Sequence, residues 1–202
     1  MPLAYFRSHP SCEVTLWRID EPIGFFKEAL LKENFPVEDG NSIKNEEKAI
    51  QWFASRYLLQ TVFPMAIPLQ KKPKPILYNG PNVSFSHSEN MVGLMLSNHP
   101  AGLDIQVFNE KLIRIRSKFT EGNESAIVNA PSNLAALSLL WSIKEAVFKY
   151  YETDLPFKSI RLLSHDSVEN IAKVEVLRKG KLSYHTLLAD FIDELSLAYI
   201  LE

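Results

Sequence analysis

Two oxygen-bearing side chains interrupt an apolar segment near the middle of the chain. In residues 102–108 (GLDIQVF), apolar positions alternate with Asp104 and Gln106. Because successive side chains of a β-strand point to opposite faces, Asp104 and Gln106 would share one face. A carboxylate inside such a strand needs a cation, hydrogen-bond donors or a metal ion, since burying a lone charge is strongly unfavourable. The alternative is a strand end with both groups in water, which the strand pattern alone favours.

A second acid lies close to the apolar stripe of a predicted helix. At about 100° per residue, Glu145 lies roughly 40° from Trp141 around the helix axis. Lys144 and Lys149 flank it in the sequence, and Lys149 is four residues further on. An ion pair between Glu145 and Lys149 would stabilise the helix by only a few tenths of a kcal/mol. This local ion pair and a catalytic role explain the pattern equally well.

Basic and polar side chains precede both acids. Lys44, Lys48 and Arg56 fall on a broad common face of a predicted helix, where they could bind phosphate. A solvated face with nearby acids as counterions is the more frequent explanation of such a pattern. Ser86 and His87 stand at the end of a predicted strand, where they could bind a ligand or satisfy backbone groups of a turn.

The elements that must position these residues mix helices and strands. Two long helices are expected, one capped by Ser42 and running to residue 62, the other capped by Ser132 and running to residue 151. Residues 70–81 should form an irregular connection because their prolines lack N–H groups. The order of elements indicates an α+β protein of two similar halves rather than a doubly wound parallel sheet. Strands are expected at residues 13–19, 83–86, 91–97, 103–108, 159–163, 172–178, 182–190 and 194–201, with a short helix from about residue 22 and a polar insert at 124–131.

Composition narrows the possible classes of protein. With 202 residues, 46% of them hydrophobic, the chain can bury a sizeable core in one large or two small domains. A net charge of −2 provides no global basic field of the kind that gathers nucleic acid. The single cysteine, Cys12, excludes an intrachain disulfide framework and a Cys-rich zinc site. Without a signal-like N-terminus or an apolar run of bilayer length, the sequence predicts a soluble cytoplasmic protein.

Short segments along the chain together resemble the 4′-phosphopantetheinyl transferase superfamily, particularly its larger single-chain branch associated with surfactin synthetase. The most specific segment is 141–149 (WSIKEAVFK), which matches the family pattern Trp-x-x-Lys-Glu-Ala/Ser-x-x-Lys at every defining position. The resemblance covers residues 42–151 well, and the terminal portions match only in their strand-rich character. The other segments follow in family order: 74–77 (KPIL), 83–88 (VSFSHS), 102–105 (GLDI) and 118–121 (KFTE).

The resemblance implies two α+β halves related by a pseudo-twofold axis, with coenzyme A and Mg²⁺ between them. Residues 1–100 would form an N-terminal half with coenzyme A phosphate contacts, and residues 101–202 a C-terminal half with the metal and catalytic residues. The implied catalytic residues are Asp104, Lys144 and Glu145, and the implied Mg²⁺ ligands are Asp104, Gln106 and Glu145. The implied coenzyme A contacts are Lys44, Lys48, Arg56, Lys74, Ser86, His87, Lys144 and Lys149.

Two positions depart from the family pattern. Many relatives have Asp-x-Glu on the strand, whereas this chain has Gln106 as the third residue of that motif, so the site loses one negative charge. Gln106 can still offer a carbonyl oxygen or orient a metal-bound water, so weaker metal affinity is expected rather than inactivity. The glycine of the common Gly-Lys-Pro segment is Pro73 here, which leaves Lys74 in place.

The implied activity is Mg²⁺-dependent transfer of the 4′-phosphopantetheine arm of coenzyme A to a serine of an acyl or peptidyl carrier protein, with release of 3′,5′-ADP. Glu145 would activate the serine directly or through a water, and His87 would contact phosphate. We expect a monomer that acts without nucleic acid or membrane. Two alternatives are a noncatalytic carrier-protein or coenzyme-A-binding module of the same fold, and an unrelated α+β scaffold whose motifs coincide by chance.

Overall fold

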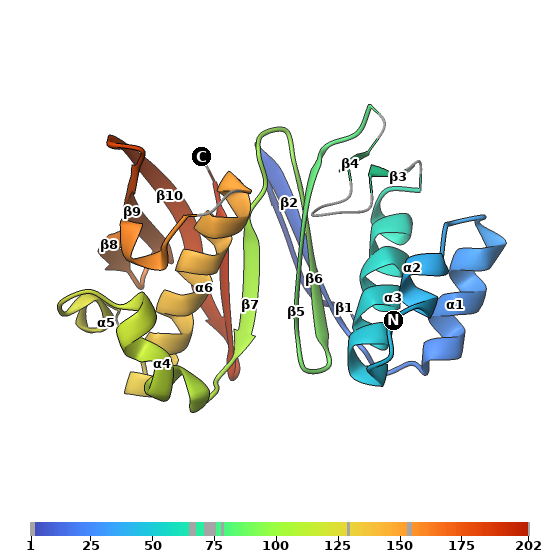
Figure 1. The fold of residues 1–202 in the computed structure, drawn as a ribbon, viewed down its shortest axis with the longest axis horizontal. Coiled ribbons are helices and arrows are strands. Elements are labelled where there is room, and N and C mark those ends of the chain that lie inside the picture. Colours follow the sequence, from blue (N-terminus) through green and yellow to red (C-terminus); the bar gives the residue numbers. More distant parts are fainter. Residues whose placement is uncertain are drawn as a thin grey trace.

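The computed structural model describes residues 3–64, 68–70, 76–77, 79–128, 130–152 and 155–201, with the side chains of residues 68–70 and 76 left aside. These residues form two halves that lie side by side, each made of an antiparallel sheet and packed helices (Figure 1). The α+β class predicted from the sequence is therefore confirmed. The pseudo-twofold relation between the halves and the division of roles between them stay predictions.

The first half places helices on one face of a sheet of order β1-β2-β6-β5. Short strands β3 and β4 pair with each other beside it. The strands are β1 (Leu3–His9), β2 (Cys12–Arg18), β3 (Pro68–Gln70), β4 (Ile76–Leu77), β5 (Asn82–Ser88) and β6 (Met91–Ser97), and the helices are α1 (Ile23–Lys32), α2 (Glu38–Asn41) and α3 (Glu46–Val62).

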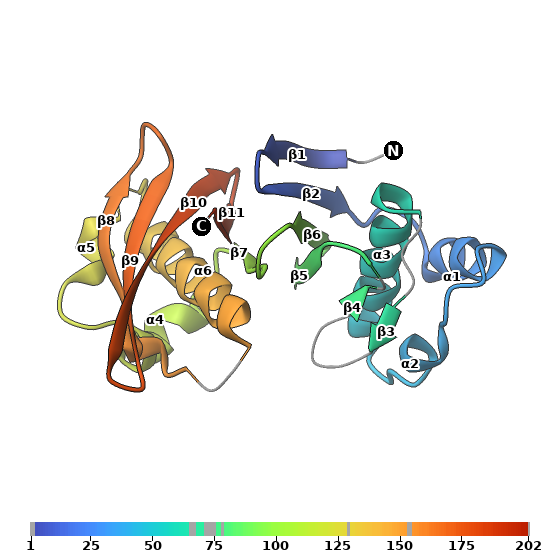
Figure 2. The same cartoon turned by 90° about the horizontal axis from the view of Figure 1, so that it is seen from above.

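The second half packs a long helix, α6 (Asn133–Tyr151), against a sheet of order β7-β11-β10-β9-β8 (Figure 2). Shorter helices α4 (Lys111–Phe119) and α5 (Glu124–Ile127) and a 3-10 turn, η1 (Phe157–Ser159), lie beside α6. The strands are β7 (Leu103–Val107), β8 (Ile160–Asp166), β9 (Ile171–Arg178), β10 (Lys181–Ile192) and β11 (Leu195–Ile200).

An apolar core between the two sheets joins the halves. It includes Leu16 and Met95 from the first sheet and Leu103, Ile105 and Leu197 from the second. Since Leu103 and Ile105 project into this core, strand alternation turns the polar side chains of β7 to its other face. Burial of apolar surface between the sheets therefore fixes the direction in which the predicted metal ligands project.

Gly102 allows α6 to lie unusually close to the start of β7. A Cβ atom at this position would lie 2.1 Å from the backbone oxygen of Ala146, closer than nonbonded atoms can approach. The close packing of helix on strand brings Lys149 of α6 to Asp104 of β7. The close packing of α6 on β7 thus explains the glycine in the GLDI segment, independently of any catalytic role.

The long helices and most strands agree with the sequence prediction, although their ends differ. Helix α3 begins at Glu46, where the side chain of Asn45 accepts a hydrogen bond from the Lys48 backbone N–H, rather than at a Ser42 cap. The hydroxyl of Ser42 instead donates to the Asp39 carbonyl. Sequence patterns missed β1 and α4. The connection predicted to be irregular, residues 70–81, contains β4 and the end of β3, and the predicted polar insert at 124–131 contains α5.

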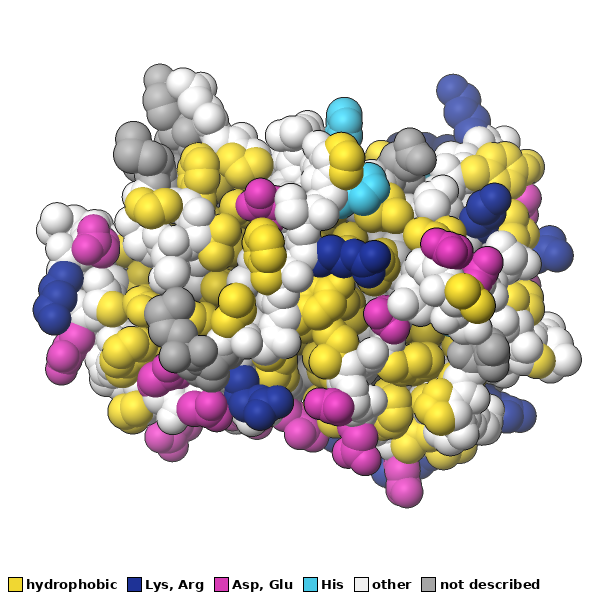
Figure 3. All heavy atoms as spheres, turned by 180° about the vertical axis from the view of Figure 1, so that it is seen from behind, with side chains coloured by type: hydrophobic (Ala, Val, Ile, Leu, Met, Phe, Trp, Pro, Cys, Tyr) yellow, Lys and Arg dark blue, Asp and Glu magenta, His cyan; other side chains and the backbone are white. Residues whose placement is uncertain are grey.

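The β1 edge of the first sheet presents an apolar surface. Leu3 and Phe6 on this strand are 52% and 55% exposed. Seen from behind, hydrophobic side chains are spread over the face of the molecule, with Lys or Arg and His side chains among them near its centre (Figure 3). Strand β5, which carries Ser86 and His87, is the opposite edge of the same sheet.

Within the described ranges, none of the helices has the length and apolar character needed to cross a membrane.

Candidate active site

Asp104 lies at the centre of a hydrogen-bonded group between the two halves. Its Oδ1 accepts hydrogen bonds from Lys149 Nζ at 2.7 Å and from Ser86 Oγ at 2.9 Å. The Lys149 ammonium also donates to the Leu103 carbonyl at 2.9 Å and to Ser86 Oγ at 3.1 Å. The charged partner that Asp104 needs is therefore Lys149 of α6. Because α6, β5 and β7 each contribute a side chain, the group exists only where the halves meet.

The second carboxylate of the predicted pair, Glu145 of α6, lies near enough to Asp104 and Lys149 for their charges to act on it. Burial, and then the negative charge of Asp104, raise the pKa of Glu145, while Lys149 opposes this effect. The other oxygen of Asp104, Oδ2, is buried and has no hydrogen-bond partner among the described residues. A buried carboxylate oxygen without a donor is unfavourable unless a cation reaches it. This pair of acids therefore suits a divalent cation.

Gln106 shares one face of β7 with Asp104, because the two residues are separated by one position on the strand. Its Nε2 donates to the Val107 carbonyl at 2.7 Å, so the amide oxygen is the atom through which Gln106 could bind an ion. No cluster of three or more His, Cys, Asp or Glu side chains able to hold a metal occurs in the described part of the chain. Two carboxylates and an amide still suit Mg²⁺, which commonly binds one or two carboxylates and takes its remaining ligands from water and substrate phosphates.

Arg56 and His87 form the N-terminal side of this site. The Arg56 guanidinium lies 4.5 Å from the ring centroid of Trp52 and 4.8 Å from that of Phe85. Burial lowers the pKa of Arg56 to about 10, so the guanidinium keeps its charge at neutral pH. His87 is exposed at the rim, yet partial desolvation and then the charge of Lys149 lower its pKa, which leaves the ring neutral at pH 7.

Lys144, in contrast, is not brought to this group. Its Nζ pairs with Glu124 Oε2 at 2.8 Å and donates to the Phe157 carbonyl at 3.3 Å, and the side chain is 0% exposed. Lys144 and Glu145 are neighbours in the sequence, but they point about 100° apart around the helix. The resemblance implied a catalytic role and a phosphate contact for Lys144. Because its ammonium is directed toward α5, we leave Lys144 out of the proposed site.

Glu124 is the buried acid that the sequence reasoning missed. Besides Lys144, it accepts hydrogen bonds from the Glu121 backbone N–H at 2.7 Å and the Leu162 backbone N–H at 2.8 Å. A signal for it was present, since Lys144 occupies the same helical stripe as the apolar residues Leu140 and Val147. A lysine in such a stripe requires an acidic partner, because an unpaired buried ammonium is strongly unfavourable.

Removal of Glu124 is expected to destabilise the protein. In Glu124→Ala, the buried ammonium of Lys144 loses its counterion, which should lower the free energy of unfolding by about 3–5 kcal/mol. Urea denaturation measures this difference. The matched control is Glu121→Ala, whose side chain is 57% exposed and lies 4.0 Å from Lys158, and which should change stability by at most about 1 kcal/mol. Equal stabilities of the two variants would contradict the buried ion pair.

Three further lysines were predicted to contact coenzyme A. Two of them lie apart from Arg56, and the third falls outside the described residues. Lys44, just before α3, and Lys48, in its first turn, are both exposed. Lys48 is eight residues before Arg56, which corresponds to about 12 Å along the helix axis. Lys74 falls outside the residues that the structure describes. Contacts of these three lysines with coenzyme A stay predictions.

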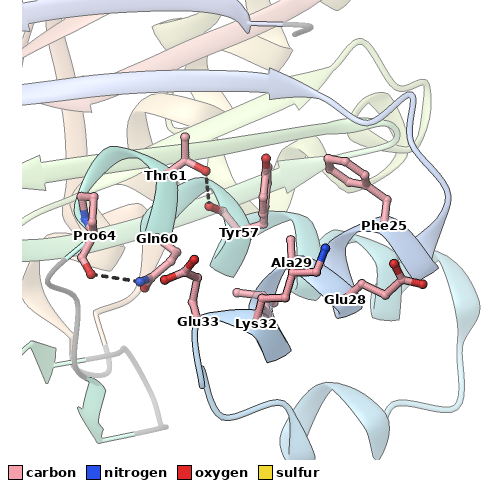
Figure 4. Close-up of a pocket in the computed structure, with 10 residues that line it drawn as sticks. Phe25, Glu28, Ala29, Lys32, Glu33, Tyr57, Gln60, Thr61 and Pro64 are labelled. Atoms are coloured by element: carbon pink, nitrogen blue, oxygen red, sulfur yellow. Dashed lines mark hydrogen bonds between the residues drawn. The ribbon is translucent and has the colours of Figure 1, made fainter.

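A cavity of about 400 Å³ between α1 and α3 is separate from the acidic pair (Figure 4). Glu28 and Glu33 contribute two acids to its lining and Lys32 a single cation, so its charge does not suit a pyrophosphate. Gln60 spans its end and donates to the Pro64 carbonyl at 2.9 Å. The group around Asp104 is therefore the better candidate for a phosphate-bearing substrate.

Comparison with known proteins identifies the family. The model of the 4′-phosphopantetheinyl transferase superfamily matches residues 100–200, which is half of the chain. The chain therefore belongs to this superfamily. The matched residues include Asp104, Glu145 and Lys149, whereas Arg56 and His87 precede them.

A curated relative shares part of this similarity. The chain is 33% identical over 79 residues to the 4′-phosphopantetheinyl transferase gsp of Aneurinibacillus migulanus. The match covers 38% of this chain and 33% of that protein, so the chain spans about a third of the length of this relative. The relative's activity is thus a starting point for a proposal about this chain.

Proposed function

We propose that the chain transfers the 4′-phosphopantetheine arm of coenzyme A to a serine hydroxyl of an apo carrier protein and releases 3′,5′-ADP. Mg²⁺ would be held by Asp104, Glu145 and the amide oxygen of Gln106. The observation that carries the proposal is the convergence of a strand carboxylate and a helix carboxylate beside Lys149. Membership of the superfamily and the name of the relative support the same activity.

The cations on both sides of the acidic pair suit the charge of coenzyme A. The Arg56 guanidinium is held between two aromatic rings, and such a fixed planar fork favours paired hydrogen bonds to phosphate oxygens. The neutral ring of His87 can donate one N–H to a phosphate oxygen. The side chain of Lys149 is 23% exposed, so its ammonium borders the site while it balances Asp104. Together these groups would orient the diphosphate.

Glu145 is the candidate base of the reaction. The serine oxygen forms a bond to the β-phosphorus, its proton passes to Glu145 directly or through a water, and the electron pair of the broken P–O bond leaves with 3′,5′-ADP. Burial and then the charge of Asp104 raise the pKa of Glu145 in the absence of a metal ion. Mg²⁺ bound to Glu145 would oppose this rise, which favours the route through a water. Mg²⁺, when bound, would supply charge stabilisation on the phosphate oxygens.

Mass measurement of the carrier protein tests the proposal. The purified chain is incubated with coenzyme A, Mg²⁺ and either an apo acyl or an apo peptidyl carrier protein. We expect the carrier to gain the mass of one phosphopantetheine arm, 3′,5′-ADP to appear, and a chelator to prevent both. An unchanged carrier mass, with thermal stabilisation of the chain by coenzyme A, would instead indicate the noncatalytic binding module.

Gln106 offers a graded test of the metal site. Gln106→Glu adds a third carboxylate beside Asp104, so the Mg²⁺ concentration for half-maximal transfer should fall about tenfold. A titration of the transfer rate with Mg²⁺ measures this. The control Asn98→Asp adds the same charge at an exposed position in the turn after β6 and should leave the titration unchanged. The same midpoint in both variants would place Gln106 away from the ion.

A further inference from the structure

A row of serines on β5 connects the two halves through side chains. Within the described residues, β7 is an edge strand that pairs with β11. Along its other edge, every second backbone N–H of β7 has no neighbouring strand of its sheet and needs an acceptor from elsewhere. Serine hydroxyls of β5 provide these acceptors, and all of them are buried. The bonds run from Leu103 N–H to Ser84 Oγ at 3.0 Å, from Ile105 N–H to Ser86 Oγ at 3.1 Å and from Val107 N–H to Ser88 Oγ at 3.0 Å.

The hydroxyl of Ser86 makes more hydrogen bonds than those of Ser84 and Ser88. Its hydroxyl donates to Asp104 Oδ1 at 2.9 Å and accepts from Ile105 N–H and from Lys149 Nζ at 3.1 Å. A hydroxyl group offers one donor and two acceptor sites, so these three bonds use its whole capacity. The coenzyme A contact that the resemblance implied for Ser86 is therefore not available to its hydroxyl in this arrangement.

The flanking serines hold the register in which Ser86 reaches Asp104. Ser84 and Ser88 lie two residues to either side of Ser86, so strand alternation places all three on one face of β5. Each bonds the corresponding alternate residue of β7, and together they prevent β7 from sliding along β5. In the part of the chain that the structure describes, neither flanking serine bonds to Asp104 or Lys149.

We infer that Ser86 is a positioning residue, which fixes Asp104 Oδ1 and Lys149 so that Asp104 Oδ2 stays available to a divalent cation beside Glu145. The identity of that cation and of the reaction rests on the proposed transferase function. Ser84 and Ser88 serve to hold the halves together. A hydroxyl at position 86 thus couples the packing between the halves to the geometry of the acidic pair.

The experiment compares Ser86→Ala with the matched controls Ser84→Ala and Ser88→Ala. Each substitution removes the acceptor of one buried N–H, so each should lower Tm by roughly 2–8 °C. Only Ser86→Ala should also weaken Mn²⁺ binding, by about 10–100-fold, since groups that orient metal ligands have effects of this size. Paramagnetic resonance of Mn²⁺ without coenzyme A measures the affinity. Ser86→Thr, which keeps a hydroxyl, should restore most of it.

The transfer assay adds a second readout and separates the two hypotheses. In Ser86→Ala, kcat should fall with little change in KM for coenzyme A, because Ser86 acts on the acids rather than on the nucleotide. Equal Mn²⁺ affinity in all three alanine variants, or no saturable Mn²⁺ binding to the wild type, would overturn the positioning role. Mn²⁺ binding that depends on Ser86 in a protein that modifies no carrier would instead refute the transferase and leave the positioning role intact.

Discussion

Glu145→Gln is expected to lower kcat of carrier modification by about 10³-fold, because glutamine keeps the size of the side chain but cannot accept the serine proton. The loss of a negative ligand should add to the effect. Mass-resolved kinetics with saturating coenzyme A and Mg²⁺ measures it. The matched control is Glu169→Gln, an exposed position after β8, which should keep wild-type turnover. Wild-type kcat in Glu145→Gln would remove the proposed base.

The same substitution should leave the protein at least as stable as the wild type. The folded state raises the pKa of Glu145 above 4.5, so the folded protein favours the protonated form. The stability associated with that proton is complete below about pH 4.5 and is lost as the pH rises through the raised pKa. In EDTA, the Tm of Glu145→Gln relative to wild type should therefore increase as the pH rises from about 4.5 through the raised pKa of Glu145. A lower Tm across that range would contradict the assigned environment.

Local patterns singled out both acids, and the family resemblance joined them into a pair. Alternation placed Asp104 on a strand face, and helical periodicity placed Glu145 near an apolar stripe. What periodicity could not supply was the partner from another element. Lys149 was four residues from Glu145 and suggested a local ion pair, whereas the structure pairs it with Asp104 of β7. Local spacing indicates which charges need partners, and the tertiary packing decides which partners they receive.

The surroundings of Arg56 likewise combine one contact set by local spacing with another set by tertiary packing. Trp52 lies four residues before Arg56, so helical spacing alone places the ring beside the guanidinium. Phe85 comes from β5, and its position opposite the guanidinium depends on how α3 packs against the first sheet. The alternating serines of β5 were visible in the sequence, but the β7 N–H groups that they bind were not. Strand β1 was missed because its exposed, uneven pattern gives little periodic signal.

Asp104→Asn should also lower kcat by about 10³-fold, yet its effect on stability should be opposite to that of Glu145→Gln. The charge of Asp104 is balanced by Lys149 at 2.7 Å, so neutralising Asp104 leaves a partly buried ammonium beside a neutral amide. The free energy of unfolding should fall by about 1–3 kcal/mol. Asp20→Asn, at an exposed position, is the matched control and should change neither property.

A double-mutant cycle assigns that loss to the ion pair. If Lys149 and Asp104 stabilise one another, the combined variant Asp104→Asn with Lys149→Met should lose less stability than the sum of the single variants, by about 0.5–3 kcal/mol. Additive losses would mean that the two side chains act independently. Opposite stability changes in two equally inactive variants would show that Lys149 balances the charge of Asp104, whereas the metal-free folded protein disfavours the charged form of Glu145.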